Sequence, residues 1–311
     1  MTMNSIWITG GKGFIGRNLA KTIASNQKKV FGIGHGSWSQ EDCIQWSYES
    51  WMNAEIDFAS LNHLASQAGL PETIYHLAGG SAVGPSIQNP YEDFQRTVDT
   101  TARLLEWVRQ VSPKTKVIGT SSAAVYGSSF DCPIKENDLG HPYSPYGFHK
   151  SMLEKLFDSY RESFDLNTTI VRLFSVYGAG LEKQLLWDIC QKLSKSEGDK
   201  IVLNGTGMEL RDWLHVSDAA NLLCSLGNRD VSLDVINGGT GIATSIHSVA
   251  KLVVAAWGKH HAVEFSGVAR KGDPQSLVAD TSLATSFGHN AQVPLAEGIK
   301  EVVDWFKVRK H

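Results

Sequence analysis

The chain has 311 residues, of which 42% are hydrophobic and 20% are charged, and its formal net charge at pH 7 is −3. This composition is typical of a globular protein with one large domain or two closely associated ones. Its lysines and arginines form no dense run, which argues against nucleic acid or an anionic membrane surface as a partner. No apolar stretch approaches the ~20 residues that span a bilayer, and no secretory leader pattern opens the chain. The sequence therefore predicts a cytoplasmic protein.

Cysteine and histidine usage gives no sign of a disulfide framework or a metal site. The four cysteines are widely separated and none belongs to a C-x-x-C pair. The eleven histidines include no H-E-x-x-H spacing. We therefore expect reduced thiols and no bound metal.

The first motif is a glycine loop between a strand and a helix. Residues 6–9 read as a short apolar strand, and residues 17–25 have the pattern of a helix. Between them, Gly10 permits a tight turn, Gly13 lets the backbone approach a pyrophosphate, and Gly16 lets the helix lie close to the strand. The N-terminus of such a helix attracts phosphate. The motif predicts a dinucleotide site, with a glycine-rich turn that binds nothing as the alternative.

The end of the second strand, residues 30–33, bears on the choice between NAD and NADP. An NAD site usually carries an acidic residue there for the ribose hydroxyls, but this chain has Gly34. Lys12 in the glycine loop, with His35 or Ser37 after the strand, is suited to a 2′-phosphate instead. We therefore expect NADP, with NAD as the alternative.

Further strands and helices alternate up to about residue 174. The predicted strands are residues 54–57, 73–77, 116–120 and 168–173, and an apolar stripe predicts one long helix over residues 91–111. Such alternation predicts an α/β fold with a doubly wound parallel sheet of the Rossmann type, covered on both faces. Asp57, at the end of one of these strands, is a candidate for the adenine edge.

The pattern becomes less regular beyond residue 174. We expect a helix over residues 184–194, a strand over 200–203, a helix from Ser217, a further strand of the main sheet at 235–237 and a closing helix over 295–307. The predicted domains are residues 1–174, with returns near 215–240, for the cofactor, and residues 175–311 mainly for the substrate.

A tyrosine and a lysine four residues apart form a candidate acid/base pair. Ser144 and Pro145 are residue types that cap and open a helix, so Tyr146 and Lys150 would lie on one face of it. A free tyrosine has a pKa near ~10, and a nearby cation favours its phenolate form. Ser121 and Ser122, at the carboxyl end of the strand over residues 116–120, both bring hydroxyl groups to the sheet edge where they could join the pair. The alternative is a solvated surface pair.

Taken together, these motifs resemble the extended short-chain dehydrogenase/reductase superfamily, and within it the nucleotide-sugar epimerase/dehydratase family. The resemblance spans nearly the whole chain. The matching segments are residues 9–16, 122–127 and 146–150, and, in the pattern of the UDP-galactose 4-epimerases, residues 76–79, 82–84, 86, 90 and 211–216.

The resemblance implies roles for individual residues. Tyr146 would take the proton from a sugar hydroxyl. Lys150 would hold the nicotinamide ribose and lower the pKa of the tyrosine. Ser122 would bind the reacting oxygen, with the neighbouring Ser121 as the alternative for this role. The cofactor-binding residues would be Gly10, Lys12, Gly13, Phe14, Ile15, Gly16, His35, Ser37, Asp57, Phe58, Leu77, Ala78, Gly79, Tyr146 and Lys150. The substrate-binding residues would be Ser81, Ser122, Ser175, Arg211, Arg270 and Asp273.

Departures from the family pattern narrow the expected reaction. Dehydratases carry an Asp-Glu pair where this chain has Ala123 and Ala124, which argues against dehydration. The first hypothesis is a 4-epimerase that oxidises a nucleotide-diphosphate sugar and reduces it again on the other face. The second is an NADPH-consuming nucleotide-sugar 4-ketoreductase, and the third is a non-catalytic NADP-binding sensor. The resemblance also implies a homodimer that pairs through its long helices.

Overall fold

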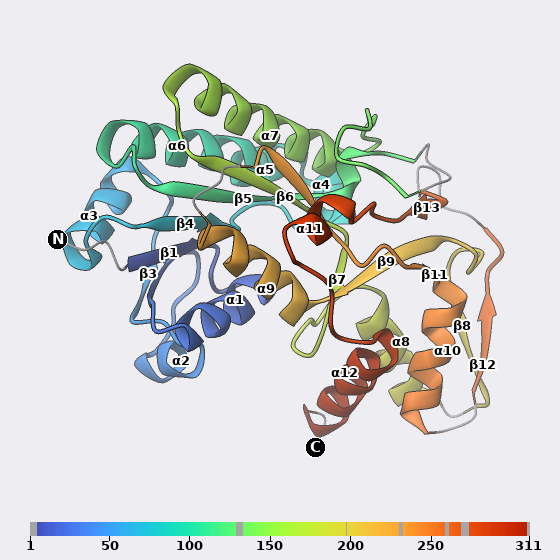
Figure 1. Ribbon diagram of the computed structural model, residues 1–311. Helices are drawn as coiled ribbons and strands as arrows, with labels where there is room; N and C mark the ends of the chain where they lie inside the picture. The colour runs from blue at the N-terminus through green and yellow to red at the C-terminus, as the bar shows by residue number, and fades with distance from the viewer. Residues whose placement is uncertain are drawn as a thin grey trace. The chain divides into compact units, whose positions relative to one another are not determined.

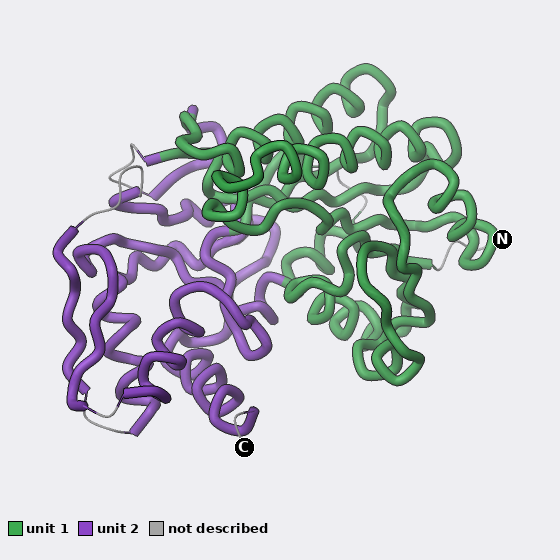
Figure 2. Tube along the Cα trace, turned by 180° about the vertical axis from the view of Figure 1, so that it is seen from behind, with its two compact units in different colours: residues 1–127, 140–173, 220–236 green, residues 128–139, 174–219, 237–311 purple. Residues whose placement is uncertain are grey.

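The computed structural model describes residues 5–128, 133–196, 198–229, 233–258, 261–268 and 274–309. The chain divides into two compact units, which Figure 2 distinguishes by colour. Unit 1 comprises residues 1–127, 140–173 and 220–236, and unit 2 comprises residues 128–139, 174–219 and 237–311. From the sequence, residues 1–174 are expected to bind the cofactor and residues 175–311 mainly the substrate. This assignment of functions to the two parts stays a prediction.

Unit 1 is built on a seven-stranded sheet with the order β10-β6-β5-β4-β1-β2-β3. Its strands are β1 Ser5–Thr9, β2 Lys29–Gly34, β3 Ser50–Asn53, β4 Thr73–His76, β5 Lys116–Ser122, β6 Thr168–Leu173 and β10 Val235–Gly238. The pairs from β6 to β3 are all parallel. β1 lies inside the sheet, with later strands added on both sides of it. This is the doubly wound arrangement that the sequence predicts, and the predicted Rossmann-like fold is confirmed.

Helices cover both faces of this sheet (Figure 1). The helical segments of unit 1 are α1 Phe14–Ser25, α2 Gln40–Gln45, α3 Phe58–Ala68, α4 Val83–Gln88, α5 Pro90–Phe94, a π-helical segment Gln95–Asp99, α6 Thr100–Val111, a 3-10 turn Ala123–Val125, α7 Pro145–Phe164 and the later part of α9 Val216–Gly227. A core that includes Trp7, Trp107 and Phe157 fills the space under α3, α6 and α7. The rings of Trp7 and Trp107 lie 5.3 Å apart between centroids.

Two predicted elements of unit 1 differ from the structure. The strand expected over residues 54–57 is wrong, because β3 ends at Asn53 and Asp57 instead caps α3, accepting a hydrogen bond from the Ser60 N–H at 2.8 Å. An N-cap side chain competes for backbone donors and so favours a loop before the helix. The helix expected over residues 91–111 is interrupted by a π-helical segment, where the Thr100 hydroxyl donates to the Gln95 carbonyl at 2.9 Å.

Unit 2 contains a four-stranded and a two-stranded sheet packed with helices. Its elements are β7 Ser175–Tyr177, α8 Gln184–Lys195, β8 Lys200–Leu203, β9 Leu210–His215, the start of α9, β11 Ala243–Ser245, α10 Ile246–Trp257, β12 Ala262–Phe265, β13 Ser276–Leu277, α11 Ser282–Ser286 and α12 Leu295–Arg309. A second apolar core joins α8, α10 and α12, with Ile189, Val249 and Phe306 nearly inaccessible to solvent. None of the helices within the described residues is long and apolar enough to cross a membrane.

Candidate active site

The carboxyl end of β5 supplies the first candidate catalytic group. Ser122 is the last residue of this strand and caps the 3-10 turn that follows, its Oγ accepting a hydrogen bond from the Ala124 N–H at 3.2 Å. Successive side chains of a strand point to opposite faces, so the neighbouring Ser121 points away from the side that Ser122 faces. Within the described part of the chain the buried Ser121 Oγ has no hydrogen-bond partner. This hydrogen bond therefore fixes the Ser122 hydroxyl at the carboxyl end of β5.

Helix α7 brings Tyr146 to this strand end. Ser144 caps the helix by accepting a hydrogen bond from the Gly147 N–H at 3.3 Å, as its residue type predicts. The Tyr146 N–H donates to the Ser86 hydroxyl on α4 at 3.0 Å, which satisfies another donor of the first turn. A Cβ at Gly147 would lie 2.7 Å from the carbonyl oxygen of Ala124. Only glycine allows the helix to start this close to the turn after Ser122.

The Tyr146 phenol and the Ser122 hydroxyl lie close enough to influence each other. Burial raises the pKa of the Tyr146 phenol, the Ser122 hydroxyl opposes this increase, and the charge of Asp93 adds to it. A phenol and a hydroxyl placed together in this way are suited to proton transfer with a bound sugar hydroxyl. The structure thus brings together two of the three predicted catalytic residues.

Lys150 completes the group from the next turn of α7. Its Nζ donates to the Thr120 carbonyl oxygen at 2.9 Å and lies 5.9 Å from the centroid of the Tyr146 ring. Only 4% of the residue is exposed, which excludes the alternative of a solvated surface pair. Burial lowers the pKa of the ammonium group from its usual 10.5 to about 8, while Asp93 and Glu154 oppose the decrease. A cation is therefore held beside the phenol.

A buried ion pair fixes α7 against the sheet. Arg172 on β6 donates to both carboxylate oxygens of Glu154, at 3.0 and 2.8 Å, and also to the Tyr126 hydroxyl at 2.9 Å. Both charged side chains are largely buried, with 14% and 12% exposure. Bidentate pairing of this kind fixes orientation as well as distance. It therefore sets the position of the helix that carries Tyr146 and Lys150.

The glycine loop has the shape that a dinucleotide requires. Gly10 has φ +67°, and a Cβ there would lie 2.8 Å from the Ala78 nitrogen. A Cβ at Gly16 would lie 2.6 Å from the α-carbon of Gly11, so α1 starts directly against the loop. Among the described residues no side chain caps this helix at Gly13, which leaves its first N–H groups, including those of the predicted Phe14 and Ile15, to a ligand. The loop therefore fits a bound pyrophosphate.

Tyr48 contacts the backbone of the glycine loop, a role that was not predicted from the sequence. Its hydroxyl lies 3.1 Å from both the Gly11 and the Gly16 carbonyl oxygens, and its single proton is shared between them. Trp38 and Trp51 pack on its ring at centroid distances of 5.3 and 6.3 Å. The sequence signal for this support is the crowding of Trp38, Trp46 and Trp51 into one short stretch around Tyr48.

The end of β2 gathers the residues expected to choose the cofactor. Lys12 Nζ donates to the carbonyl oxygen of Ser37 at 2.9 Å, so its charge lies at the end of this strand. His35 is exposed, and its Nε2 lies 3.7 Å from a carboxylate oxygen of Glu55. The Ser37 hydroxyl accepts a hydrogen bond from the Asn53 side-chain amide at 3.3 Å. The structure therefore places Lys12 beside Ser37.

The end of β4 is held by a buried hydrogen-bond chain through His76. The imidazole Nδ1 lies 2.7 Å from Thr9 Oγ1, and Nε2 lies 2.9 Å from Thr101 Oγ1. The Ala78 N–H donates to Thr9 Oγ1 at 3.4 Å, and the Thr101 hydroxyl donates to the Thr97 carbonyl. Thr101 Oγ1 must therefore accept from Nε2 of the imidazole, which places the ring proton on Nε2 and leaves Nδ1 to accept from the Thr9 hydroxyl. Burial lowers the pKa of His76 to about 3. A neutral imidazole thus links the glycine loop to the predicted segment Leu77 to Gly79.

Comparison with known proteins identifies the group to which this geometry belongs. Residues 6–237 match the model of the NAD dependent epimerase/dehydratase family. The chain belongs to this family. A putative UDP-glucose 4-epimerase of Methanocaldococcus jannaschii is 28% identical over 97% of this chain and 98% of its own length. The protein is accordingly an enzyme of the NAD-dependent nucleotide-sugar epimerase type, which sets aside a non-catalytic sensor.

Solved structures of family members have the same fold. The UDP-glucose 4-epimerase of Thermotoga maritima, solved with UDP-glucose, has a TM-score of 0.88 at 25% identity and covers 99% of this chain and 100% of its own. The UDP-glucuronic acid 4-epimerase of Bacillus cereus, solved with UDP-glucuronic acid and NAD, has a TM-score of 0.87 at 25% identity, with 98% and 99% coverage.

The other predicted site residues are spread over both units. Asp57 and Phe58 lie at the start of α3, where the Asp57 carboxylate is engaged as the helix cap, and Ser81 is exposed after β4. In unit 2, Ser175 begins β7, and the Arg211 guanidinium donates to the carbonyl oxygens of Leu210 and Pro274 at 2.8 Å each. Arg270 and Asp273 lie outside the described residues.

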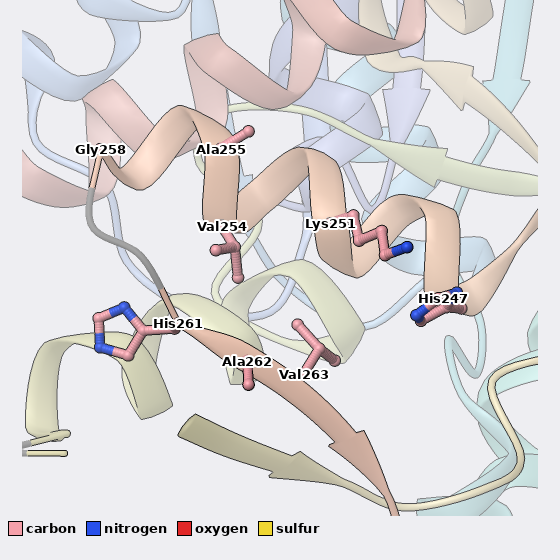
Figure 3. Close-up of a pocket in the computed structure, with 8 residues that line it drawn as sticks. All are labelled: His247, Lys251, Val254, Ala255, Gly258, His261, Ala262 and Val263. Atoms are coloured by element: carbon pink, nitrogen blue, oxygen red, sulfur yellow. The ribbon is translucent and has the colours of Figure 1, made fainter. Parts of the chain in front are cut away.

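Unit 2 also contains a groove of about 550 Å³ between α10 and β12. Figure 3 shows Lys251 and Val254 of the helix on one side and Ala262 and Val263 of the strand on the other. Its lining within the described chain includes none of the predicted site residues. The groove therefore has no bearing on the predicted catalytic group at the end of β5.

Proposed function

We propose that the protein is an NAD(P)-dependent nucleotide-sugar 4-epimerase with Tyr146 as its acid/base residue. The observation that carries this proposal is the placement of Ser122 and Tyr146 together at the end of β5, with Lys150 buried beside them. A sugar hydroxyl bound between the Ser122 and Tyr146 hydroxyl groups would meet one proton acceptor and one fixed hydrogen-bond partner.

The residues of unit 1 are suited to hold a nicotinamide dinucleotide. Gly10, Gly13 and Gly16 with the N-terminus of α1 would take the pyrophosphate, and residues 77–79 with Lys150 would hold the nicotinamide ribose. When bound, the cofactor supplies a reversible two-electron oxidation at a sugar carbon. Lys12, beside Ser37 at the end of β2, favours the 2′-phosphate of NADP over NAD.

The catalytic side chains then perform proton transfer and orientation. Tyr146 takes the proton from the C4 hydroxyl as that carbon is oxidised, and returns it after the 4-keto sugar has turned over in the site. Ser122 holds the reacting oxygen by a hydrogen bond. The Lys150 ammonium group, buried beside the Tyr146 ring, favours the phenolate over the phenol. Over the whole cycle the cofactor returns to its starting state.

The turn after Ser122 favours epimerisation over loss of water. Ala123 and Ala124 are buried, with 4% and 9% exposure, and offer no carboxyl group to expel a hydroxyl. Expulsion of water needs an acid and a base beyond the one at Tyr146. Dehydration is therefore not proposed, although the family includes dehydratases.

The substrate would be a nucleotide-diphosphate sugar, the class bound in the related T. maritima and B. cereus structures. Arg211 and Arg270 are suited to its pyrophosphate, because a guanidinium group pairs with phosphate oxygens in a bidentate manner. The remaining proposed contacts are Ser81, Ser175 and, at the nucleotide ribose, Asp273. The nucleotide and the sugar are left to direct assay.

A homodimer is proposed from the apolar side chains that α4, α5 and α7 expose. Ile87, Tyr91, Phe148 and Met152 have 62%, 71%, 42% and 45% of their surface exposed. Apolar side chains gathered on packed helices mark an interaction surface. Sedimentation at several protein concentrations tests the dimer, and the cytoplasmic location stays a prediction.

The test of the function uses purified protein with UDP- and GDP-sugars. We expect the C4 epimer to form without net change in the cofactor, and Tyr146→Phe to abolish its formation while cofactor binding persists. Tyr160→Phe, on the same helix, is the control that should remain active. Full turnover by Tyr146→Phe would contradict the proposal.

The second candidate function is an NADPH-dependent 4-ketoreductase. It is favoured by Lys12 at the end of β2 and by Gly34 in place of a ribose-binding acid. Loss of NADPH absorbance in proportion to a supplied 4-keto sugar, with no epimer formed from the corresponding alcohol, would support the reductase and exclude the epimerase.

A further inference from the structure

A buried acid and base lie behind the proposed catalytic pair. Asp93 on α5 and His149 on α7 are 7% and 9% exposed, and His149 Nδ1 lies 2.6 Å from Asp93 Oδ2. The ring of Phe94 packs edge-on against the imidazole at a centroid distance of 5.7 Å. Burying a carboxylate is costly unless a donor satisfies it, and His149 is that donor. The pair therefore has a fixed position in the fold.

Asp93 and Lys150 contact adjacent residues of the same backbone segment. A Cβ at Gly80 would lie 1.9 Å from Asp93 Oδ1, and a Cβ at Gly79 would lie 3.4 Å from Lys150 Nζ. The carboxylate and the ammonium group thus face neighbouring glycines after β4, in a buried region where charges interact strongly. The negative charge raises the pKa of both Lys150 and Tyr146.

The other charged groups around Lys150 are already neutralised or neutral. Glu154 lies one turn after Lys150 on α7. Both of its carboxylate oxygens accept hydrogen bonds from Arg172, whose charge is permanent. His76 on β4 is neutral, since burial lowers its pKa to about 3. Thr120 on β5 contributes only a carbonyl oxygen. Among the described groups that act on Lys150, Asp93 is the carboxylate without a permanently charged partner.

We propose that Asp93 is a positioning residue for the catalytic pair, held by His149 so that its negative charge keeps Lys150 protonated and keeps Tyr146 a phenol while the 4-keto sugar is in the site. The inference rests on the proposed function, because it acts through Tyr146 and Lys150. Asp93 itself would touch neither sugar nor cofactor. Its effect is to set the pH at which the tyrosine changes its charge.

The test measures the ionisation of Tyr146 directly. Tyrosinate absorbance is followed against pH in the full-length protein and in its Tyr146→Phe variant, and the difference between the two titrations isolates this one residue. The same pair of titrations is repeated with Asp93→Asn, which keeps the size of the side chain and removes its charge. We expect the midpoint for Tyr146 to fall by about one pH unit.

His149→Asn provides the matched control. Its side-chain amide can still donate to Asp93, so packing and hydrogen bonding change while the carboxylate keeps its charge. We expect this variant to leave the Tyr146 midpoint in place. An unchanged midpoint in Asp93→Asn, or an equal fall in both variants, would overturn the proposal, the latter by showing a packing effect. Circular dichroism establishes that each variant is folded before it is titrated.

The pH dependence of turnover gives a second readout. Without the Asp93 charge, Lys150 loses its proton at lower pH, so the alkaline limb of the kcat profile should move to lower pH by a similar amount. The tyrosinate titration uses no substrate. It can therefore fail while epimerase activity is present, and it can succeed even when the tested sugars are not turned over, which separates this inference from the proposed function.

Discussion

Lys150 Nζ donates a hydrogen bond to the carbonyl oxygen of Thr120 at 2.9 Å. This contact joins the helix that bears Tyr146 to the strand that ends in Ser122. It also gives the buried ammonium group a partner that carries no charge, so the positive charge remains available to the phenol.

Replacing Lys150 with methionine should remove that charge while filling the same space. We expect kcat to fall at least ~100-fold, as for the loss of a group that supports general acid/base catalysis. The control is Lys155→Met on the same helix, because 82% of the Lys155 side chain is exposed. Equal activity of the two variants would refute the role of Lys150.

Ser122 and Ser121 can be separated by single alanine substitutions. Ser122→Ala should lower kcat about 10- to 100-fold, because the reacting oxygen loses a hydrogen bond that is strongest in the transition state. Ser121→Ala should have little effect on kcat, since its hydroxyl points to the opposite side of β5. Steady-state kinetics of both variants decide the assignment, and the reverse order of effects would move the role to Ser121.

The Arg172–Glu154 pair should be needed more for stability than for chemistry. Arg172→Met leaves a buried carboxylate without its partner and should lower the free energy of unfolding by about 3–5 kcal/mol. Adding Glu154→Leu removes the unpaired charge and should restore part of that loss. Urea unfolding of the single and double variants measures both changes, and a double variant less stable than Arg172→Met would contradict this account.

His76 should make the folded state sensitive to acid. Its pKa is about 3 in the folded protein and 6.5 in a free side chain, so the unfolded chain binds the additional proton between these values. The contribution of His76 to the free energy of unfolding should therefore be complete above pH 6.5. It should fall as the pH decreases below that value, by up to about 1.4 kcal/mol per pH unit. His76→Gln should weaken this slope, measured by urea unfolding at pH 7 and pH 5, and an unchanged slope would exclude His76 as its source.

Lys12 should decide between the two forms of the cofactor. Lys12→Ala removes the cation beside Ser37 and should weaken NADP binding by about tenfold, the magnitude of one charge-assisted contact, while NAD binding changes little. Calorimetric titration with each dinucleotide measures the ratio. Lys21→Ala on α1 is the control, because Lys21 packs over the Trp46 ring. Equal losses for NAD and NADP would show that Lys12 does not recognise the 2′-phosphate.

The sequence predicted the parallel sheet and the helix that carries Tyr146, because both depend on local patterns. Strand periodicity, the glycine loop and the Ser144–Pro145 cap each act within a few residues. The π-helical segment was missed because a hydrophobic stripe does not report the hydrogen bonds that the N–H and the hydroxyl of Thr100 donate to the Gln95 carbonyl. Residues 54–57 alternate like a strand, but the capping carboxylate of Asp57 decides otherwise.

Contacts between distant segments could not be read from local patterns. Tyr48 meets the glycine loop from more than thirty positions away in sequence, and Asp93 meets His149 across 56 positions. His149 lies inside the motif that drew attention to Tyr146 and Lys150, yet its burial depends on α5. Pairings of this kind arise from the fold, and a single sequence carries little information about them.

Folding itself orders the groups at the end of β5. Ser122 is tied to the Ala124 N–H, the backbone of Tyr146 to Ser86, and Lys150 to Thr120. The conformational entropy of these side chains is therefore lost when unit 1 folds and not when a sugar arrives. Binding free energy from the nucleotide part of the substrate does not have to be used to assemble them. Sugars that differ at a distance from the reacting carbon should consequently differ more in KM than in kcat.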